Sequence, residues 1–167
     1  MKDYEYKIMF VCHGNICRSP MAEFIFKKML DEEGLTDRVF VASSAVSTEE
    51  IVGGIGNPVY HPALRELKRH GIDPGDKRAV QLKKADYEEY DLFVVMDGSN
   101  MRGAVRIFGS DPWRKLCRMM DFTARGGDVA DPWYTGDFST TYRDIYDGCT
   151  GLMEHIRLRL SPNAETE

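Results

Sequence analysis

Four short apolar segments, separated by segments with helical periodicity, most constrain how this chain can fold. Each apolar segment has the length of one buried strand. The predicted strands are residues 7–12, 38–45, 90–97 and 115–121. The predicted helices are residues 20–34, 61–72, 99–109 and 139–160. Strands that alternate with helices form a parallel sheet, so we expect an α/β fold with a four-stranded parallel sheet and helices on both faces.

The length and composition indicate one folded domain. The 167 residues are enough for a full core, and the apolar content of 43% is ordinary for a globular protein. No repeat or long linker divides the chain, so we expect a single domain over residues 1–167, with about 160–167 as a loose tail. The formal net charge of −5 argues against a nucleic-acid partner.

The amino terminus carries no apolar segment long enough for a signal peptide or a membrane span. We therefore expect no membrane partner. The chain has four cysteines, and without an export signal they suggest reduced thiols in the cytoplasm. Cys117 and Cys149 lie singly among apolar residues, and we interpret both as core residues.

The turn "CHGNICRS", residues 12–19, joins the first predicted strand to the first predicted helix. Ligands bind at the carboxyl edge of a parallel sheet, where this turn lies. Five residues separate Cys12 from Arg18, enough for the backbone to curl and point its N–H groups at an anion. The helix N-terminus attracts the same anion, and Arg18 can pair with two phosphate oxygens. The predicted phosphate-binding residues are His13, Gly14, Asn15, Ile16, Cys17, Arg18 and Ser19.

Cys12 is the candidate nucleophile at the floor of this loop. An arginine and a helix N-terminus favour the thiolate form of a cysteine. A phosphoryl group in the loop would present its phosphorus to the sulfur, so we expect a cysteinyl-phosphate intermediate. The hydroxyl of Ser19 can donate to the thiolate and ease its departure. Ser19 before Pro20 also has the pattern of a helix N-cap.

The segment "VCHGNICRSPMAE" resembles the signature of the low-molecular-weight protein tyrosine phosphatases. Further matching motifs are "SSAVS" at 43–47, "HGI" at 70–72, "MDGSN" at 96–100 and "DPWY" at 131–134. The resemblance covers nearly the whole chain. It implies hydrolysis of phosphotyrosine in proteins or of aryl phosphates, with no metal and no cofactor, by a monomer or weak dimer.

The resemblance also implies roles for residues outside the turn. Asp131, held on a loop before a proline, would be the general acid, and Trp133 and Tyr134 would border the substrate ring. Asn15 and Ser19 would share a hydrogen-bonded set with Ser43 and His70 that holds the loop. His70 alone is also typical of a helix C-terminus, and we expect Asp97 to cap the segment after it.

Cys17 has two possible roles. The resemblance implies a reversible disulfide with Cys12 under peroxide, and hence redox regulation. Alternatively, Cys17 contributes only its backbone N–H to the loop.

The pocket wall departs from the resembling family. Well-known members have an aromatic residue where this chain has Glu49. Tyr60 or Ile51, near the glycine-rich stretch that follows, could supply a substitute wall. Alternatively, Glu49 and Glu50 are only a solvated pair.

Three other functions remain open from the sequence. A related phosphoarginine phosphatase would tend to have threonine in place of Ile16. A thiol-dependent arsenate reductase would need further cysteines near the site, and Cys117 and Cys149 do not form a close pair in sequence. A phosphocysteine carrier would require neither Arg18 nor Asp131.

Overall fold

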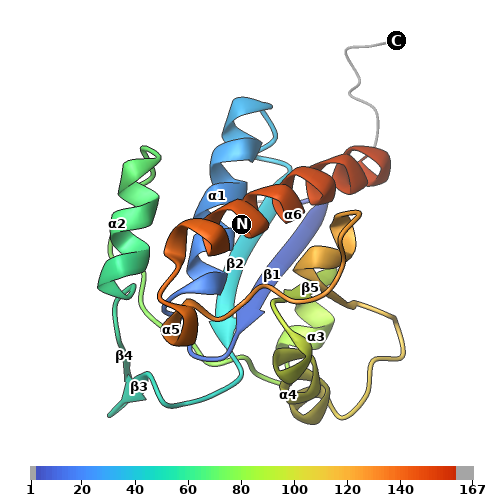
Figure 1. The fold of residues 1–167 in the computed structure, drawn as a ribbon. Coiled ribbons are helices and arrows are strands. Elements are labelled where there is room, and N and C mark those ends of the chain that lie inside the picture. Colours follow the sequence, from blue (N-terminus) through green and yellow to red (C-terminus); the bar gives the residue numbers. More distant parts are fainter. Residues whose placement is uncertain (1–2, 161–167) are drawn as a thin grey trace.

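The computed structural model describes residues 3–160, so most of the expected tail at 160–167 lies outside the described residues. A four-stranded parallel sheet forms the centre (Figure 1), in the order β2-β1-β5-β6. Its strands are β1 (Tyr6–Cys12), β2 (Val39–Ala45), β5 (Leu92–Val95) and β6 (Leu116–Arg118). The expected fold class is confirmed.

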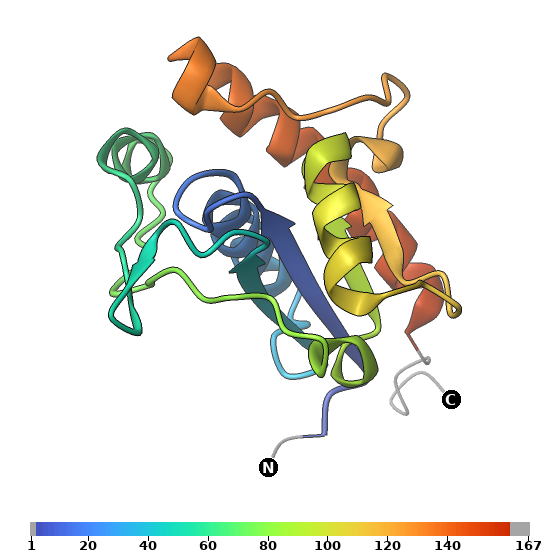
Figure 2. The same cartoon turned by 90° about the horizontal axis from the view of Figure 1, so that it is seen from below.

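Helices cover both faces of the sheet (Figures 1 and 2). They are α1 (Arg18–Glu32), α2 (His61–Arg69), α3 (Asp86–Glu89), α4 (Gly98–Phe108), α5 (Pro132–Thr135) and α6 (Phe138–Arg159). Ile8 and Phe10 of β1 point into a large core shared with α1 and α6. Met9 and Val11 point to the other face, where they pack with residues of α4. The alternation of side chains along one buried strand therefore joins two cores.

The order of the strands places the turn at 12–19 in the crevice of the fold. β1 lies between β2 and β5, so successive connections run to opposite sides of it, and ligands bind at such a switch point. α1 begins at Arg18, two residues before the predicted start. α1 has no side-chain cap, so the alternative role of Ser19 as a helix N-cap is wrong, and the Ser19 hydroxyl makes the expected contact with Cys12.

A two-stranded hairpin, β3 (Ile51–Val52) and β4 (Ile55–Gly56), follows β2. Gly53 and Gly54 form its turn with φ angles of 60° and 79°, which glycine adopts readily. The hairpin positions the preceding Glu49 and Glu50 beside the turn at 12–19.

The last strand of the sheet is shorter than the strand predicted at residues 115–121. β6 stops at Arg118, and a 3₁₀ turn, η1 (Met119–Phe122), packs against α6. A Cβ at Gly151 would lie 1.9 Å from the Phe122 carbonyl oxygen, and one at Gly148 would lie 2.8 Å from Met119. The two glycines inside α6 thus allow this close approach. Cys149 beside them is fully buried, and Cys117 is partly buried against the same core.

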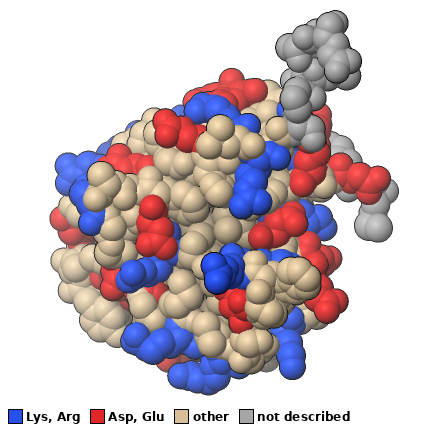
Figure 3. Space-filling view, turned by 90° about the vertical axis from the view of Figure 1, so that its right-hand side faces the viewer, with Lys and Arg blue, Asp and Glu red and all other residues tan. Residues whose placement is uncertain are grey.

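No helix within residues 3–160 is long and apolar enough to cross a membrane. Figure 3 shows lysine and arginine interspersed with aspartate and glutamate on the face drawn there. A continuous basic band of the kind that follows a nucleic-acid backbone is missing from that view.

Candidate active site

The turn at 12–19 wraps around the sulfur of Cys12, which is 3% exposed. Asn15 has a φ of 59°, in the left-handed region that asparagine tolerates better than most residues. Its backbone N–H donates to Cys12 Sγ at 3.3 Å. The Ser19 hydroxyl lies 2.9 Å from the same sulfur. Both groups are therefore placed to contact the sulfur that would act as the nucleophile.

Asn15 ties this turn to the neighbouring strand. Its Nδ2 donates to Ser19 Oγ at 2.8 Å and to Ser43 Oγ at 2.9 Å. Its Oδ1 accepts from the Val80 N–H at 2.9 Å. Ser43 in turn donates to Glu23 Oε1 at 2.6 Å. The structure therefore brings together three of the four predicted support residues, and it adds Glu23 of α1, which the sequence analysis missed.

His70, the fourth predicted support residue, does not join this set. It lies just past the end of α2, where its Nε2 is 3.3 Å from Glu66 Oε1 and its ring stacks on Tyr142 at 3.7 Å. The alternative interpretation, a histidine at a helix C-terminus, describes its position. Its side chain packs between α2 and α6 and makes these contacts away from the turn at 12–19.

Lys77, which the sequence analysis did not identify, contacts this set. Its Nζ donates to the Ser43 carbonyl oxygen at 3.1 Å and lies 3.8 Å from Glu23 Oε1. Burial lowers the pKa of Lys77, and the charge of Glu23 opposes this change. The signal for Lys77 is weak in the sequence, because a single lysine in a loop is typical of a solvated surface.

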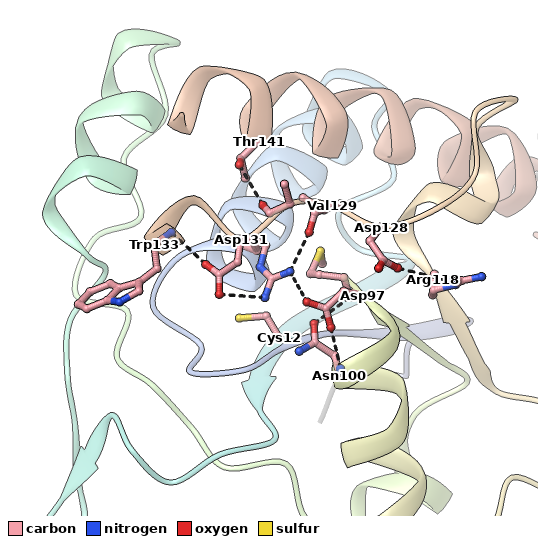
Figure 4. Close-up of polar contacts among 12 residues, drawn as sticks. Cys12, Asp97, Asn100, Arg118, Asp128, Val129, Asp131, Trp133 and Thr141 are labelled. Carbon is pink, nitrogen blue, oxygen red and sulfur yellow. Dashed lines mark hydrogen bonds and ion pairs between the residues drawn. The ribbon is translucent and has the colours of Figure 1, made fainter. Parts of the chain in front are cut away.

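Arg18 is buried beneath the pocket, 2% exposed, and three groups hold its guanidinium. They belong to Asp97, Val129 and Asp131, which are labelled in Figure 4. Nη1 donates to Asp97 Oδ2 at 2.7 Å and to the Val129 carbonyl oxygen at 2.8 Å. Nη2 lies 3.5 Å from Asp131 Oδ2. Burial alone would lower the pKa of Arg18, but the charge of Cys12 and the hydrogen bond to Asp97 raise it overall. The guanidinium thus stays charged and fixed in orientation.

Asp97 has the capping position expected from the sequence. Its Oδ1 accepts from the Asn100 N–H at 2.8 Å at the start of α4. Its other oxygen holds Arg18. One carboxylate therefore links the start of α4 to the phosphate-binding turn, a second role that the sequence analysis did not identify.

Asp131 is the N-cap of the short helix α5, which forms in the loop that was expected to hold it. Its Oδ1 accepts from the Trp133 N–H at 3.0 Å. Its Oδ2 lies 3.5 Å from Arg18 Nη2. The Thr141 hydroxyl donates to the Ala130 carbonyl oxygen at 3.3 Å and so tethers the loop to α6. The carboxylate is thereby held over the turn with part of its surface exposed.

These residues surround a pocket of about 330 Å³. Its lining comprises Cys12, His13, Gly14, Ile16, Cys17, Arg18, Glu49, Glu50, Asp131, Trp133 and Tyr134. All three predicted pocket residues, Glu49, Trp133 and Tyr134, are in this lining.

The acidic wall is not a free solvated pair. Glu49 Oε2 lies 3.0 Å from His13 Nε2, and Glu50 Oε2 accepts from Asn57 Nδ2 at 2.8 Å. Neither Tyr60 nor Ile51 lines the pocket. The Tyr60 ring instead packs 5.1 Å from the ring of Trp133, so Tyr60 supports the wall from behind.

Cys17 lines the same pocket, with 7% of its surface exposed. Burial and the charge of Cys12 both raise the pKa of its thiol, which favours the protonated form. Within residues 3–160, no three or more histidine, cysteine, aspartate or glutamate side chains cluster as a metal site would require.

We compared the chain with known protein families, sequences and structures. A family model described as low molecular weight phosphotyrosine protein phosphatase matches residues 7–161. The low molecular weight protein-tyrosine-phosphatase YfkJ of Bacillus subtilis is 33% identical over 154 residues, which cover 90% of this chain and 95% of YfkJ. The human low molecular weight phosphotyrosine protein phosphatase is 32% identical over 163 residues, which cover 88% and 93%.

The solved structures agree with the sequence comparisons. The crystal structure of YfkJ from Bacillus subtilis matches with a TM-score of 0.89 and 30% identity, over 96% of this chain and 100% of YfkJ. The chain therefore belongs to the low molecular weight phosphotyrosine protein phosphatase family, as its motifs predicted. Hydrolysis of phosphotyrosine monoesters is the activity that this membership supports.

Proposed function

We propose that the chain hydrolyses phosphotyrosine in proteins through a phosphorylated Cys12. The observation that carries this assignment is the placement of Cys12 Sγ in a turn that ends at the buried, fixed guanidinium of Arg18. A phosphoryl group in the turn would receive backbone N–H groups and the Arg18 fork on its oxygens. Its phosphorus would then face the sulfur, in line for attack.

In the first step the Cys12 thiolate attacks phosphorus and the bond from phosphorus to the tyrosine oxygen breaks. A phenolate leaves poorly without a proton. Asp131 lies over the turn beside Arg18 and, in its protonated form, would give its proton to that oxygen. The products of this step are tyrosine and a phosphorylated Cys12.

In the second step a water molecule attacks the phosphorylated Cys12. The carboxylate of Asp131 takes a proton from this water as the sulfur–phosphorus bond breaks. The released thiolate is stabilised by the Ser19 hydroxyl and the Asn15 N–H, which contact Cys12 Sγ. Inorganic phosphate leaves, and the enzyme returns to its starting state.

The alternative reactions have less support. Ile16 lines the pocket where a phosphoarginine phosphatase tends to have threonine. A disulfide relay for arsenate reduction would need a further accessible thiol besides Cys12 and Cys17, whereas Cys149 is fully buried against α1 and burial raises its pKa. A phosphocysteine carrier leaves the ordered contacts of Arg18 and Asp131 without a purpose.

Trapping the covalent intermediate tests the proposed mechanism. Radiolabelled aryl phosphate is mixed with the enzyme in the presence of a metal chelator and quenched in acid. We expect label on Cys12 in the wild type and none in Cys12→Ser, which should also lack turnover. Turnover by Cys12→Ser, or label on another residue, would overturn the assignment.

We also propose that the protein works in the cytoplasm as a monomer or weak dimer, where Cys12 and Cys17 form a reversible protective disulfide. Both residues line one pocket. Because the pKa of Cys17 is raised, disulfide formation after peroxide should quicken as the pH rises. Mass spectrometry should find a loss of two hydrogens between these residues, reversed by a dithiol. Sulfinic acid on Cys12 without that loss would contradict the idea.

A further inference from the structure

A second hollow of about 370 Å³ lies next to the catalytic pocket and shares one residue, His13, with it. Val46 and Ser47, which follow β2, form one side. The other side is a stripe of α4 that consists of Ser99, Arg102, Gly103, Arg106 and Ile107. None of the residues that form these two sides is used by the proposed reaction.

The hollow exists because α4 lies close to the segment after β2. The five α4 residues recur every three to four positions, at 99, 102–103 and 106–107, so they occupy one face of the helix. A Cβ at Gly103 would lie only 3.1 Å from Val46 Cβ. Glycine at this place therefore lets the helix approach Val46, and Arg102 and Arg106 line the hollow beside that contact.

The lining carries two positive charges and no acidic group. Arg102 and Arg106 are both exposed and form no ion pair with any residue in the described part of the chain. Two hydroxyl groups, those of Ser47 and Ser99, lie in the same hollow. Paired arginines with hydroxyl donors form a site for a carboxylate or phosphoryl group.

The catalytic pocket has the opposite character on its outer wall. Glu49 and Glu50 line it, so an acidic neighbour of the phosphotyrosine would be repelled on that side. The second hollow adjoins this pocket at His13. An acidic residue next to the phosphotyrosine would meet the positive charges of Arg102 and Arg106 there.

We infer that this hollow binds an anionic side chain of the substrate, on a residue close in sequence to the phosphotyrosine. The inference rests on the proposed function and specifies its substrate class as acidic phosphotyrosine segments. The two pockets border the same histidine, and successive residues of an extended peptide advance by about 3.3–3.6 Å. An aspartate, glutamate or phosphoserine one to three positions from the phosphotyrosine is therefore within reach.

The test compares phosphotyrosine peptides that differ in one residue. Each of the three positions before and after the phosphotyrosine is in turn aspartate, asparagine or phosphoserine, and kcat/KM is measured at low ionic strength. The double variant Arg102→Gln, Arg106→Gln removes the charges of the hollow. The control Arg65→Gln, Lys68→Gln removes the same charge from the exposed surface of α2.

We expect the wild type and the α2 control to prefer aspartate over asparagine by about fivefold at one or more positions, as for a partly exposed ion pair. The double variant should reduce that ratio to near one. A stronger preference for phosphoserine, lost in the same variant, would identify a phosphoryl group as the better ligand. The inference fails if the wild type shows no preference, or if the double variant keeps it. The proposed function fails separately, if the wild type hydrolyses none of the peptides.

Discussion

At the scale of single residues, Arg18 connects the two acids of the site. Its guanidinium contacts Asp97 on one side and Asp131 on the other, so its plane is fixed before any substrate arrives. A preorganised donor stabilises charge in the transition state without a cost of reorganisation. The shape of the guanidinium, and not only its charge, should therefore matter.

Arg18→Lys tests this conclusion. Lysine keeps the positive charge but lacks the planar fork that pairs with two phosphate oxygens. We expect kcat/KM for an aryl phosphate to fall by about 10²–10³, the usual loss for one transition-state donor. Arg65→Lys on the exposed face of α2 serves as the control and should leave the rate unchanged. Near-normal activity of Arg18→Lys would show that charge alone suffices.

Asp131→Asn tests the general acid. The amide preserves the size of the side chain and its acceptance from the Trp133 N–H, but it has no proton to donate. The single-turnover rate with a basic phenol as leaving group should fall by about 10²–10⁴. An acidic phenol needs less help, so its rate should fall less. An equal fall for both phenols would mean that Asp131 shapes the loop, and Asp137 would be the next candidate.

At the scale of elements, the packing of η1 against α6 depends on glycines that would otherwise weaken a helix. Alanine inside an exposed helix is favoured over glycine by about 1 kcal/mol. At Gly151 the added Cβ would instead meet the Phe122 carbonyl oxygen at 1.9 Å. The Phe122 backbone cannot move aside as a flexible side chain can. The destabilisation from this steric clash should therefore exceed the stabilisation from the higher helix propensity of alanine.

We therefore expect Gly151→Ala to lower the free energy of unfolding by about 1–3 kcal/mol, as for an overpacked core. Urea denaturation measures this change. Gly98→Ala in α4 is the matched control, because its nearest contact is the mobile end of Arg102 at 3.3 Å. The control should be neutral or slightly stabilising. A stabilising effect of Gly151→Ala would contradict the close approach of η1.

The elements differ in how far the sequence determines them. Strong apolar periodicity predicted the sheet and its major helices, because burial on a face of the sheet is decided by local pattern. The hairpin β3–β4 and the four-residue helices α3 and α5 were missed. Segments of two to four residues are too short to show a helical or strand periodicity. Such short elements therefore depend on tertiary contacts. β6 was predicted too long because η1 continues its apolar pattern into a different backbone conformation.

Within the candidate site, the turn at 12–19 was predictable because its chemistry is contiguous in sequence. The expected contact between the Ser19 hydroxyl and Cys12 is present. His70 shows the limit of this reasoning. His70 matches a motif, but the residue that reaches Ser43 is Lys77. Contacts between distant segments are set by how α2 and the following loop pack, which local pattern does not encode.

At the scale of the whole molecule, the candidate site joins β1, α1, α4 and the loop before α6. An anion bound in the turn would therefore hold several elements together. A ligand that binds only the folded state at about 100 times its dissociation constant adds about 2.7 kcal/mol to stability. For a domain of this size such a gain corresponds to roughly 5–10 °C in Tm.

We expect inorganic phosphate at that concentration to raise the Tm of the wild type by this amount. Cys12→Ser should keep the shift, because the backbone N–H groups and Arg18 that bind phosphate remain. Arg18→Ala should lose most of it, and its Tm without phosphate shows whether the variant is folded. The exposed variant Arg65→Gln, Lys68→Gln and a chloride solution of equal ionic strength control for general salt effects. A full shift in a folded Arg18→Ala variant would mean that phosphate binds elsewhere, and the turn would lose its assignment as the phosphate site.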